Sequence, residues 1–436
     1  MQTSELTFRS SRVLVRRVYG DLSAALHRND LIKIFTAIVS EGMLSISNFV
    51  IGILMVKFAT KSEYGMYVLL FSFIGILSAY QNAIINAPLV VLINTKYENE
   101  RRTYVSSLAV GKNYLFVPPL LLLIITGSLY CAINSTPGIY IIELFVLSAV
   151  ALIYVSKEFI RVLYFVKLDT NAIFKMDLFN LATVLTGMLL LFYIDRVSSL
   201  SAIIVLGCGY FASYICGKRK DLYYSPTNNK SIRGALIENW FYGKWASIGA
   251  TSGLLQERGY IYIVSGLLGL SNVADIAAAR LFVMPISLLN VGSSKIAVAK
   301  GSKMLSLNMN NKFREFVLTF ICILLIISLF YFLLIILTSN LIIGFLGRKY
   351  INAKGLILLW GVFFLISTIR TQLGTALIAY KQFKKVAKSD IWGSTLAITS
   401  CFLLVFTIGR SGAIISLMLG EFVTLILYLK LYLRLK

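Results

Sequence analysis

The chain has 436 residues, of which 58% are hydrophobic and only 14% are charged. Soluble domains average about 45–50% apolar and about 25% charged residues, so this composition excludes a water-soluble globular protein. It also excludes a disordered chain, a collagen-like repeat and a disulfide-dense secreted scaffold. The sequence therefore predicts an all-α polytopic membrane protein.

Basic residues dominate the charge of the chain: 42 Lys and Arg stand against 19 Asp and Glu, a formal net charge of +23. On a soluble chain this excess would indicate nucleic acid as the partner. Here the basic residues form short clusters between apolar runs, so we expect membrane lipids as partners and no nucleic acid. One histidine and five cysteines without a C-x-x-C pair indicate neither a disulfide framework nor a metal site, and we expect no cofactor.

Long apolar runs predict membrane-spanning helices, because backbone exposed to lipid has to satisfy its hydrogen bonds within the segment. About twelve runs qualify, with eleven or thirteen left open because some are short and one is interrupted by Gln81 and Asn82. The predicted spans are Ile34 to Val56, Tyr64 to Asn86, Tyr114 to Ile133, Ile139 to Ser156, Met176 to Ile194, Leu200 to Cys216, Trp245 to Leu270, Ile276 to Val298, Phe316 to Leu337, Leu356 to Tyr380, Ile391 to Ile408 and Ala413 to Leu433.

The distribution of Lys and Arg between the predicted loops sets the orientation, since these residues accumulate in cytoplasmic segments. With the N-terminus inside, 32 of the 42 fall in inner segments, 7 in outer segments and 3 within spans. We therefore expect both termini to be cytoplasmic and the number of crossings to be even.

The chain divides into four parts on this reading. Residues 1–32 form a basic cytoplasmic segment, either an interfacial amphipathic helix or a disordered tail. Residues 33–216 form an N-lobe of six spans, residues 217–239 a cytoplasmic linker, and residues 240–436 a C-lobe of six spans. Two lobes of similar span number are typical of transporters built from parallel repeats.

Enzyme chemistry is not expected from this sequence. No G-x-x-x-x-G-K-[ST] phosphate loop is present. A membrane glycan polymerase or ligase would need catalytic groups in a sizeable outer segment, whereas the longest predicted outer loop, Thr338 to Gly355, has no acidic residue. Loss of such an enzyme would leave single glycan units displayed outside the cell, and loss of a transporter would leave them facing inward.

Three arginines lie within predicted spans: Arg258, Arg280 and Arg370. A charged side chain costs about 2.5–3.5 kcal/mol at mid-membrane, so these positions indicate a polar interior. Because a guanidinium group binds phosphate oxygens through two parallel hydrogen bonds, we expect the three arginines to line a cavity for an anionic substrate. The alternative is that each arginine pairs with a buried acid.

Other polar residues within the spans could serve the same cavity. Glu41, Glu257 and Glu421 are candidates for proton or sodium coupling, because a carboxylate in a low dielectric can load and release a proton. Asn48 and Asn82 are candidates for hydrogen bonds to sugar hydroxyls. For each of these residues a satisfied contact between packed helices is the alternative.

Several short motifs resemble one family of transporters. The run F-A-T-K-S-E-Y-G-M-Y (Phe58 to Tyr67) resembles the L-x-x-x-E-Y-G-x-Y element of polysaccharide transporters in the multidrug/oligosaccharidyl-lipid/polysaccharide (MOP) exporter superfamily. Two further runs resemble elements of the same polysaccharide transporters: Y-G-K-W (Tyr242 to Trp245), and A-A-A-R (Ala277 to Arg280) followed by Pro285. Within the superfamily, the span layout is most similar to Wzx-type O-antigen flippases.

This resemblance implies a MOP/MATE-like, V-shaped bundle of two lobes in the bacterial cytoplasmic (inner) membrane. It implies a substrate made of oligosaccharide linked to undecaprenyl pyrophosphate, as used for O-antigen and lipopolysaccharide, with a glycan polymerase and a chain-length regulator as further partners. The family has no fixed arginine motif that would assign the three arginines individually. The related lipid II flippases have about fourteen spans, which this chain does not match. A cation-coupled multidrug exporter of the same superfamily is the alternative, although its cavity should be acidic.

Overall fold

The computed structural model describes residues 28–435 apart from residues 94, 98, 135–137 and 219–226. This part of the chain is all-helical, which confirms the predicted fold class. The expected interfacial helix falls almost entirely on residues 1–27, outside the described residues, and residues 28–32 belong to the first membrane helix.

The helices follow the predicted spans closely but extend beyond most of them. Several begin at a side-chain cap that satisfies an orphan backbone N–H, as Thr60 does for α3 and the Ser198–Ser201 capping box does for α8. In chain order the elements are α2 (Arg28–Phe58), α3 (Lys61–Gln81), the π-helical turn η1 (Asn82–Asn86), α4 (Ala87–Leu92), α5 (Arg101–Ile133), α6 (Ile139–Val166), α7 (Thr170–Tyr193), α8 (Ser199–Gly217), α9 (Asn229–Leu268), α10 (Leu270–Val283), α11 (Pro285–Ser306), α12 (Asn310–Leu346), the 3-10 turn η3 (Arg348–Ala353), α13 (Lys354–Ala379), α14 (Phe383–Ile408) and α15 (Arg410–Leu433).

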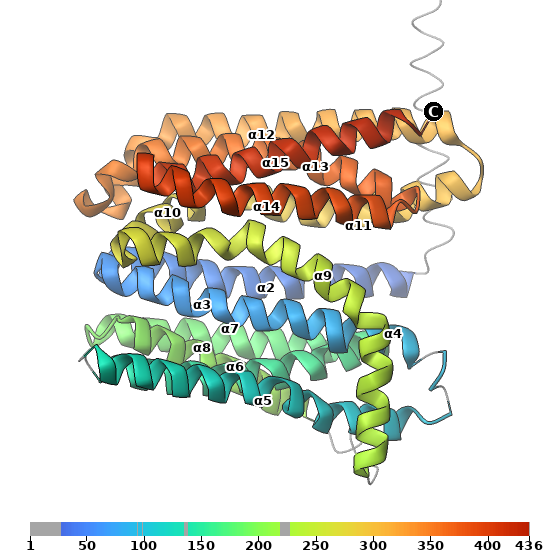
Figure 1. Cartoon of the computed structure of the whole chain (residues 1–436), viewed down its shortest axis with the longest axis horizontal. Helices are drawn as coiled ribbons and strands as arrows, with labels where there is room; N and C mark the ends of the chain where they lie inside the picture. Colours follow the sequence, from blue (N-terminus) through green and yellow to red (C-terminus); the bar gives the residue numbers. More distant parts are fainter. Residues whose placement is uncertain (1–27, 94, 98, 135–137, 219–226, 436) are drawn as a thin grey trace, which may run out of the picture.

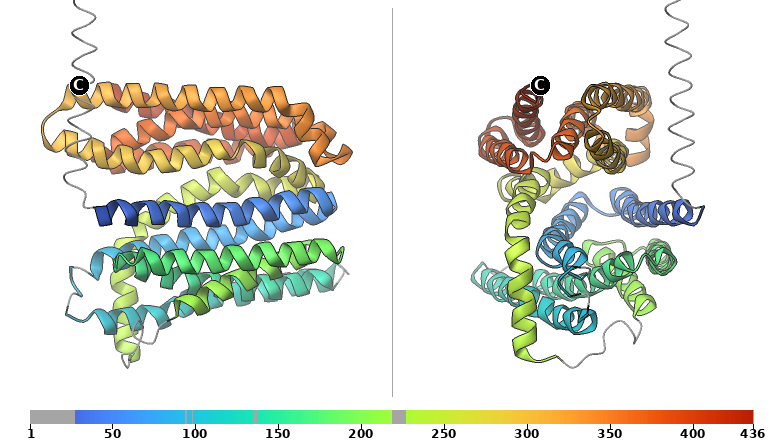
Figure 2. Two further views of the ribbon diagram at one scale, coloured as in Figure 1. Left: turned by 180° about the vertical axis from the view of Figure 1, so that it is seen from behind. Right: turned by 90° about the vertical axis from the view of Figure 1, so that its right-hand side faces the viewer.

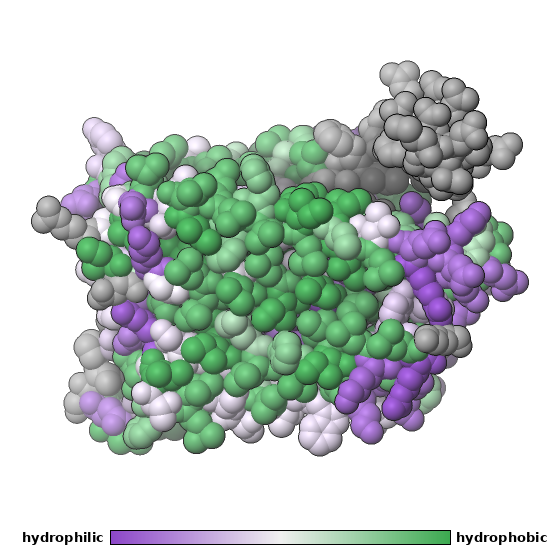
Figure 3. Space-filling view, turned by 90° about the horizontal axis from the view of Figure 1, so that it is seen from above, coloured by the Kyte–Doolittle hydropathy of each residue, from purple (hydrophilic) through white to green (hydrophobic). Residues whose placement is uncertain are grey.

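Within the described part of the chain, ten helices are long and apolar enough to cross a membrane. The pair α10 and α11, bent by 57° at its junction, makes an eleventh span if it is counted as one. α9 is not among them, because it carries the polar run from Gln256 to Arg258, yet its second part lies parallel to the other helices (Figure 1). Counting α9 brings the number to the predicted twelve. A broad apolar band with polar ends covers the face shown in Figure 3.

The helices form two groups with α9 between them (Figures 1 and 2). One group consists of α2 to α8, which we call the N-lobe, and the other of α10 to α15, which we call the C-lobe. The predicted C-lobe began at residue 240 and so also included the second part of α9. α9 packs against α3 of the N-lobe and α14 of the C-lobe. The cytoplasmic position of the termini stays a prediction.

α9 begins within the predicted linker 217–239 and first crosses one end of the N-lobe before it turns along the bundle (Figure 1). Its fully buried Asn239 fixes this crossing. The Asn239 amide donates to the carbonyl oxygens of Ile84 and Ile85 in η1, both at 3.2 Å, and accepts from the Tyr104 hydroxyl at 2.5 Å. Part of the predicted loop is therefore a docked helix.

Candidate functional site: a charged cavity in the N-lobe

A cavity of about 220 Å³ opens in the N-lobe, with walls from α2, α3, α6, α7 and α8 and one residue from α9. Its lining combines charged groups, amides and aromatic rings, the mixture expected of a site that holds a polar ligand. The residues that carry charge or a side-chain amide are Glu41, Asn48, Lys157, Glu158, Arg161, Asn180 and Arg258. Phe71, Tyr154 and Tyr210 supply the aromatic surface.

Arg161 of α6 is the centre of an ion-pair cluster in this cavity. Its Nε lies 3.1 Å from Oδ2 of Asp177, its Nη2 lies 3.1 Å from Oε1 of Glu41, and its Nη1 lies 3.4 Å from Oε1 of Glu158. The Asp177 side chain is fully buried, whereas that of Glu41 is 50% exposed. Glu41 is therefore the member of the cluster that a ligand or a proton reaches most easily.

Lys157 is buried to 1% exposure and has partners of two kinds. Its Nζ lies 3.2 Å from Oε2 of the adjacent Glu158 and 5.7 Å from the ring centroids of both Tyr154 and Tyr210. Cation–π contacts of this kind strengthen when the cation is removed from water. Lys157 and Arg161 are thus both neutralised within the N-lobe.

Arg258 of α9 differs from the other two cavity bases because no described residue pairs with its guanidinium group. The group lies against α3: a Cβ atom on Gly75 would come within 2.5 Å of its Cζ, and the Phe71 ring centroid is 5.8 Å away. Glu257 is its neighbour in the chain, but its side chain is exposed and the two make no ion pair. The donors of Arg258 are consequently free for an anionic ligand.

Two buried acceptors beside the cavity also lack a donor. Oδ1 of Asp177 and Oδ1 of Asn180, one turn apart on α7, have no hydrogen-bond partner among the described residues. A bound proton, a cation or a water molecule would satisfy them, because an unpaired buried acceptor is costly. This wall of the cavity therefore has the chemistry for a coupling ion.

The structure does not bring Arg370 to this cavity. Arg370 of α13 lies in the C-lobe, where its Nε is 2.5 Å from Oε2 of Glu421 and its Nη1 is 3.5 Å from Oδ1 of Asp390. Glu421 also accepts from the Gln256 amide at 2.8 Å, and Asp390 accepts from the Tyr428 hydroxyl at 2.6 Å. Arg370 and Glu421 thus neutralise each other inside a helix-packing network, the alternative that the sequence left open.

The remaining candidates are dispersed. Asn48 lines the cavity. Arg280 of α10 does not line the cavity; its guanidinium carbon lies 5.2 Å from the Trp360 ring centroid, and its buried Nε has no hydrogen-bond partner among the described residues. Glu257 and Asn82 are both exposed and neither lines the cavity.

Sequence reasoning missed the α6 charges, because the segment from Lys157 to Lys175 was expected to be an inner loop. That expectation is wrong for its first part: α6 continues to Val166, so Lys157, Glu158 and Arg161 lie within a membrane helix. The signal was their spacing, since Tyr154, Lys157, Glu158 and Arg161 recur every three or four residues and share one helix face. Asp177 of α7 lies within the predicted span Met176 to Ile194 but was not singled out.

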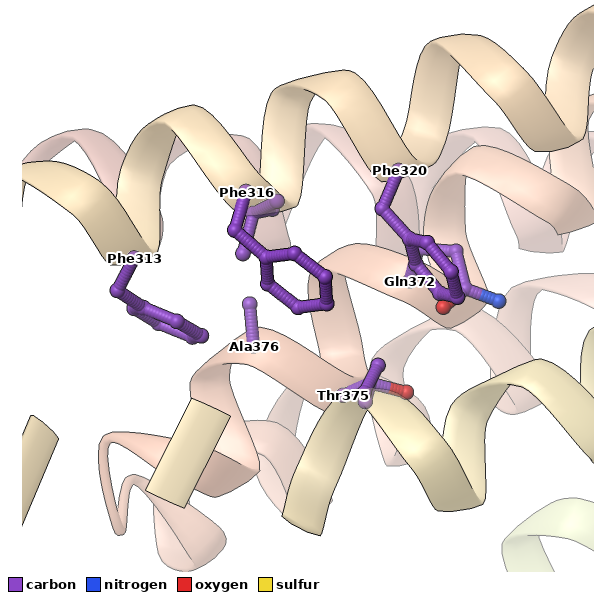
Figure 4. Close-up of a pocket in the computed structure, with 8 residues that line it drawn as sticks. Phe313, Phe316, Phe320, Gln372, Thr375 and Ala376 are labelled. Carbon is purple, nitrogen blue, oxygen red and sulfur yellow. The ribbon is translucent and has the colours of Figure 1, made fainter. Parts of the chain in front are cut away.

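A second hollow lies in the C-lobe between α11, α12 and α13 (Figure 4). Phe313, Phe316 and Phe320 of α12 face Thr375 and Ala376 of α13 across it. Its volume is about 10 Å³, which is roughly the space of one water molecule. This hollow is a packing gap, so the N-lobe cavity is the candidate site.

Comparisons with known proteins bear on the fold. No family model matches the sequence, and neither does any curated protein. Among solved structures, the chain is similar to a multidrug resistance MATE family transporter of the MOP superfamily in its inward-facing conformation, with a TM-score of 0.74 and 15% identity over 89% of this chain and 94% of that one. It is also similar to the lipid II flippase MurJ in an inward closed conformation, with a TM-score of 0.70 and 15% identity over 92% and 87% of the two chains.

A eukaryotic MATE transporter, AtDTX14, has a TM-score of 0.64 and 14% identity over 92% of this chain and 96% of that one. At these identities the likeness concerns the fold. The chain is a multi-pass membrane protein with the fold of MOP superfamily transporters, and these solved structures are of transporters and flippases.

Proposed function

We propose that the protein is a flippase that moves an oligosaccharide linked to undecaprenyl pyrophosphate, such as an O-antigen repeat unit, across the bacterial cytoplasmic membrane by alternating access. The unpaired Arg258 in the N-lobe cavity carries this proposal. An uncompensated guanidinium group in a membrane protein is costly unless a ligand supplies the negative charge. Phosphate oxygens match its paired N–H donors in geometry as well as in charge.

The rest of the cavity suits the sugar next to the phosphates. Phe71, Tyr154 and Tyr210 offer apolar ring surfaces, while Asn48 and Asn180 offer amides for hydroxyl groups. Similarity in fold to a lipid II flippase makes a lipid-linked substrate compatible with this architecture. The glycan polymerase and the chain-length regulator stay predicted partners.

Energy would come from coupling at the wall formed by Glu41, Asp177 and Asn180. When an anionic headgroup approaches, it competes with Glu41 for Arg161, because Glu41 is the half-exposed partner. A released Glu41 can take up a proton, and Asp177 and Asn180 hold the two unpaired acceptors. Of the three carboxylates expected to couple ions, Glu41 is the one that lines the cavity.

A leaflet-specific assay tests the proposal. The purified protein is reconstituted into vesicles that contain a fluorescent undecaprenyl-pyrophosphate disaccharide, and an impermeant glycosidase reports the outer-leaflet fraction over time. We expect wild-type protein to accelerate movement and Arg258→Ala to lose most of the acceleration. Movement that is as slow with wild-type protein as with empty vesicles would refute the proposal.

A cation-coupled multidrug exporter is the second candidate, favoured by the three N-lobe acids Glu41, Glu158 and Asp177. Lys157, Arg161 and Arg258 balance these three acids in formal charge, which leaves no net negative charge for a cationic drug. Binding of ethidium to the purified protein that is displaced by protons or sodium, but not by pyrophosphate, would favour this candidate.

A further inference from the structure

The E-Y-G segment that opens α3 has no part in the cavity. It lies at the end of the bundle drawn on the left in Figure 1, where the junction of α9 and α10 meets α2 and α3. The cavity residues on α3 begin at Phe71, ten positions after Lys61, which corresponds to about 15 Å along the helix. The segment therefore closes the bundle beyond one end of the cavity.

One buried acid joins the two lobes at this end. The side chain of Asp275 on α10 is 4% exposed, and its Oδ1 lies 2.7 Å from Nζ of Lys61 on α3 of the N-lobe. Its other oxygen, Oδ2, pairs with Arg410 on α15 of the C-lobe. Asp275 thus has one partner on each side of the boundary between the lobes.

A second lysine crosses the same boundary in the opposite direction. Nζ of Lys349, in η3 of the C-lobe, donates to the carbonyl oxygens of Ala59 at 2.6 Å and Lys57 at 3.2 Å. These carbonyls are at the C-terminal end of α2, where the helix leaves acceptors unsatisfied and favours a cation. Burial lowers the pKa of Lys349, and so does the like charge of the nearby Lys61. This end of the bundle therefore keeps two positively charged side chains close together.

The motif residues between these contacts have separate structural roles. Glu63 accepts from the backbone N–H of Ser199 at 2.5 Å and so holds α3 to α8 within the N-lobe. Gly65 allows α3 to touch α10, because a Cβ atom at this position would lie 2.0 Å from the carbonyl oxygen of Leu270. The segment is therefore anchored to its own lobe and shaped to fit the other.

We infer that Lys61, Gly65, Asp275 and Lys349 form a latch that holds the two lobes together at this end of the bundle. The distribution of Lys and Arg predicts that this is the outer end. The latch opens when the cavity faces outward. This inference rests on the alternating access of the proposed function. The polar contacts of the latch are made by two partly exposed lysines, and water can replace them. When Lys61 leaves, Arg410 still pairs with Asp275, so opening strands no buried acid.

Cysteine accessibility tests the latch without any glycan substrate, so a failed flipping assay leaves this test valid. Leu44, which lines the cavity, is replaced by cysteine in a chain whose five native cysteines are removed. An impermeant maleimide is then added to one face of oriented vesicles at a time. We expect Lys61→Gln combined with Lys349→Gln to speed labelling from the latch face at least about fivefold and to slow it from the opposite face.

Lys354→Gln is the matched control, because Nζ of Lys354 bonds Asn340 within the C-lobe at 3.0 Å and crosses no boundary. Its labelling rates should equal those of the parent. The single variant Lys349→Gln, which removes no ion pair, is measured in parallel in case the double variant fails to fold. Unchanged labelling in the folded variants, or an equal increase in the control, would overturn the latch.

Discussion

Arg258 and Arg370 provide a direct contrast between a proposed binding residue and an arginine that is paired inside a helix-packing network. Replacing Arg370 with alanine leaves Glu421, 3% exposed, without its partner at 2.5 Å and removes a bond to Asp390. Breaking a buried ion pair by removing one partner costs about 3–5 kcal/mol. Among the described residues no acid pairs with Arg258, so its replacement should leave the free energy of unfolding within about 1 kcal/mol of wild type.

Substrate affinity should show the opposite ranking. A charge-assisted hydrogen bond contributes about 1.5–3 kcal/mol, so Arg258→Ala should weaken pyrophosphate-lipid binding about 10- to 150-fold. Arg258→Lys should recover only part of this loss, because an ammonium group cannot form the paired contact.

Both properties can be measured on the same detergent-purified samples. Thermal unfolding reports stability, and calorimetric titration with a short-chain prenyl pyrophosphate reports binding. The reasoning is refuted if Arg258→Ala unfolds as readily as Arg370→Ala, or if the folded Arg258→Ala protein binds the ligand as tightly as wild type.

Further predictions concern the packing of the lobes. Arg161→Gln should destabilise the N-lobe by about 3–5 kcal/mol, because three carboxylates lose the base that they share. A melting curve equal to that of the wild-type protein would contradict the ion-pair cluster. Gly65→Ala should lower the unfolding temperature through overpacking worth about 1–3 kcal/mol. Gly253→Ala should not, because a Cβ atom at that position would meet no atom within 4 Å. Equal effects would show that α3 and α10 do not touch. Asn239→Ala should cost about 1–3 kcal/mol, because it removes two hydrogen bonds to carbonyls of η1 and leaves the buried Tyr104 hydroxyl without its acceptor. Increased protease cleavage at the start of α9 would report its release.

The sequence alone was sufficient for the membrane architecture. Spanning helices are encoded locally, because lipid demands about 20 apolar residues and self-contained hydrogen bonds, so the spans follow from the order of apolar and polar residues. The MOP-like fold was implied by the resemblance of short motifs, and the similarity to solved structures supports it. It also identified Arg258 as a charge that needs an explanation, since an arginine within an apolar run is costly wherever the run packs.

Tertiary structure decided which charges are free. Arg161 and Glu41 are 120 residues apart in the chain, and Arg370 and Glu421 are 51 apart, so no spacing rule could pair them. Ion pairs depend on distances of a few ångströms between helices, and those follow from packing of whole faces. Only the assembled bundle could therefore leave Arg258 unpaired in a cavity, neutralise Arg370 with Glu421, and place Asp275 between a lysine of one lobe and an arginine of the other.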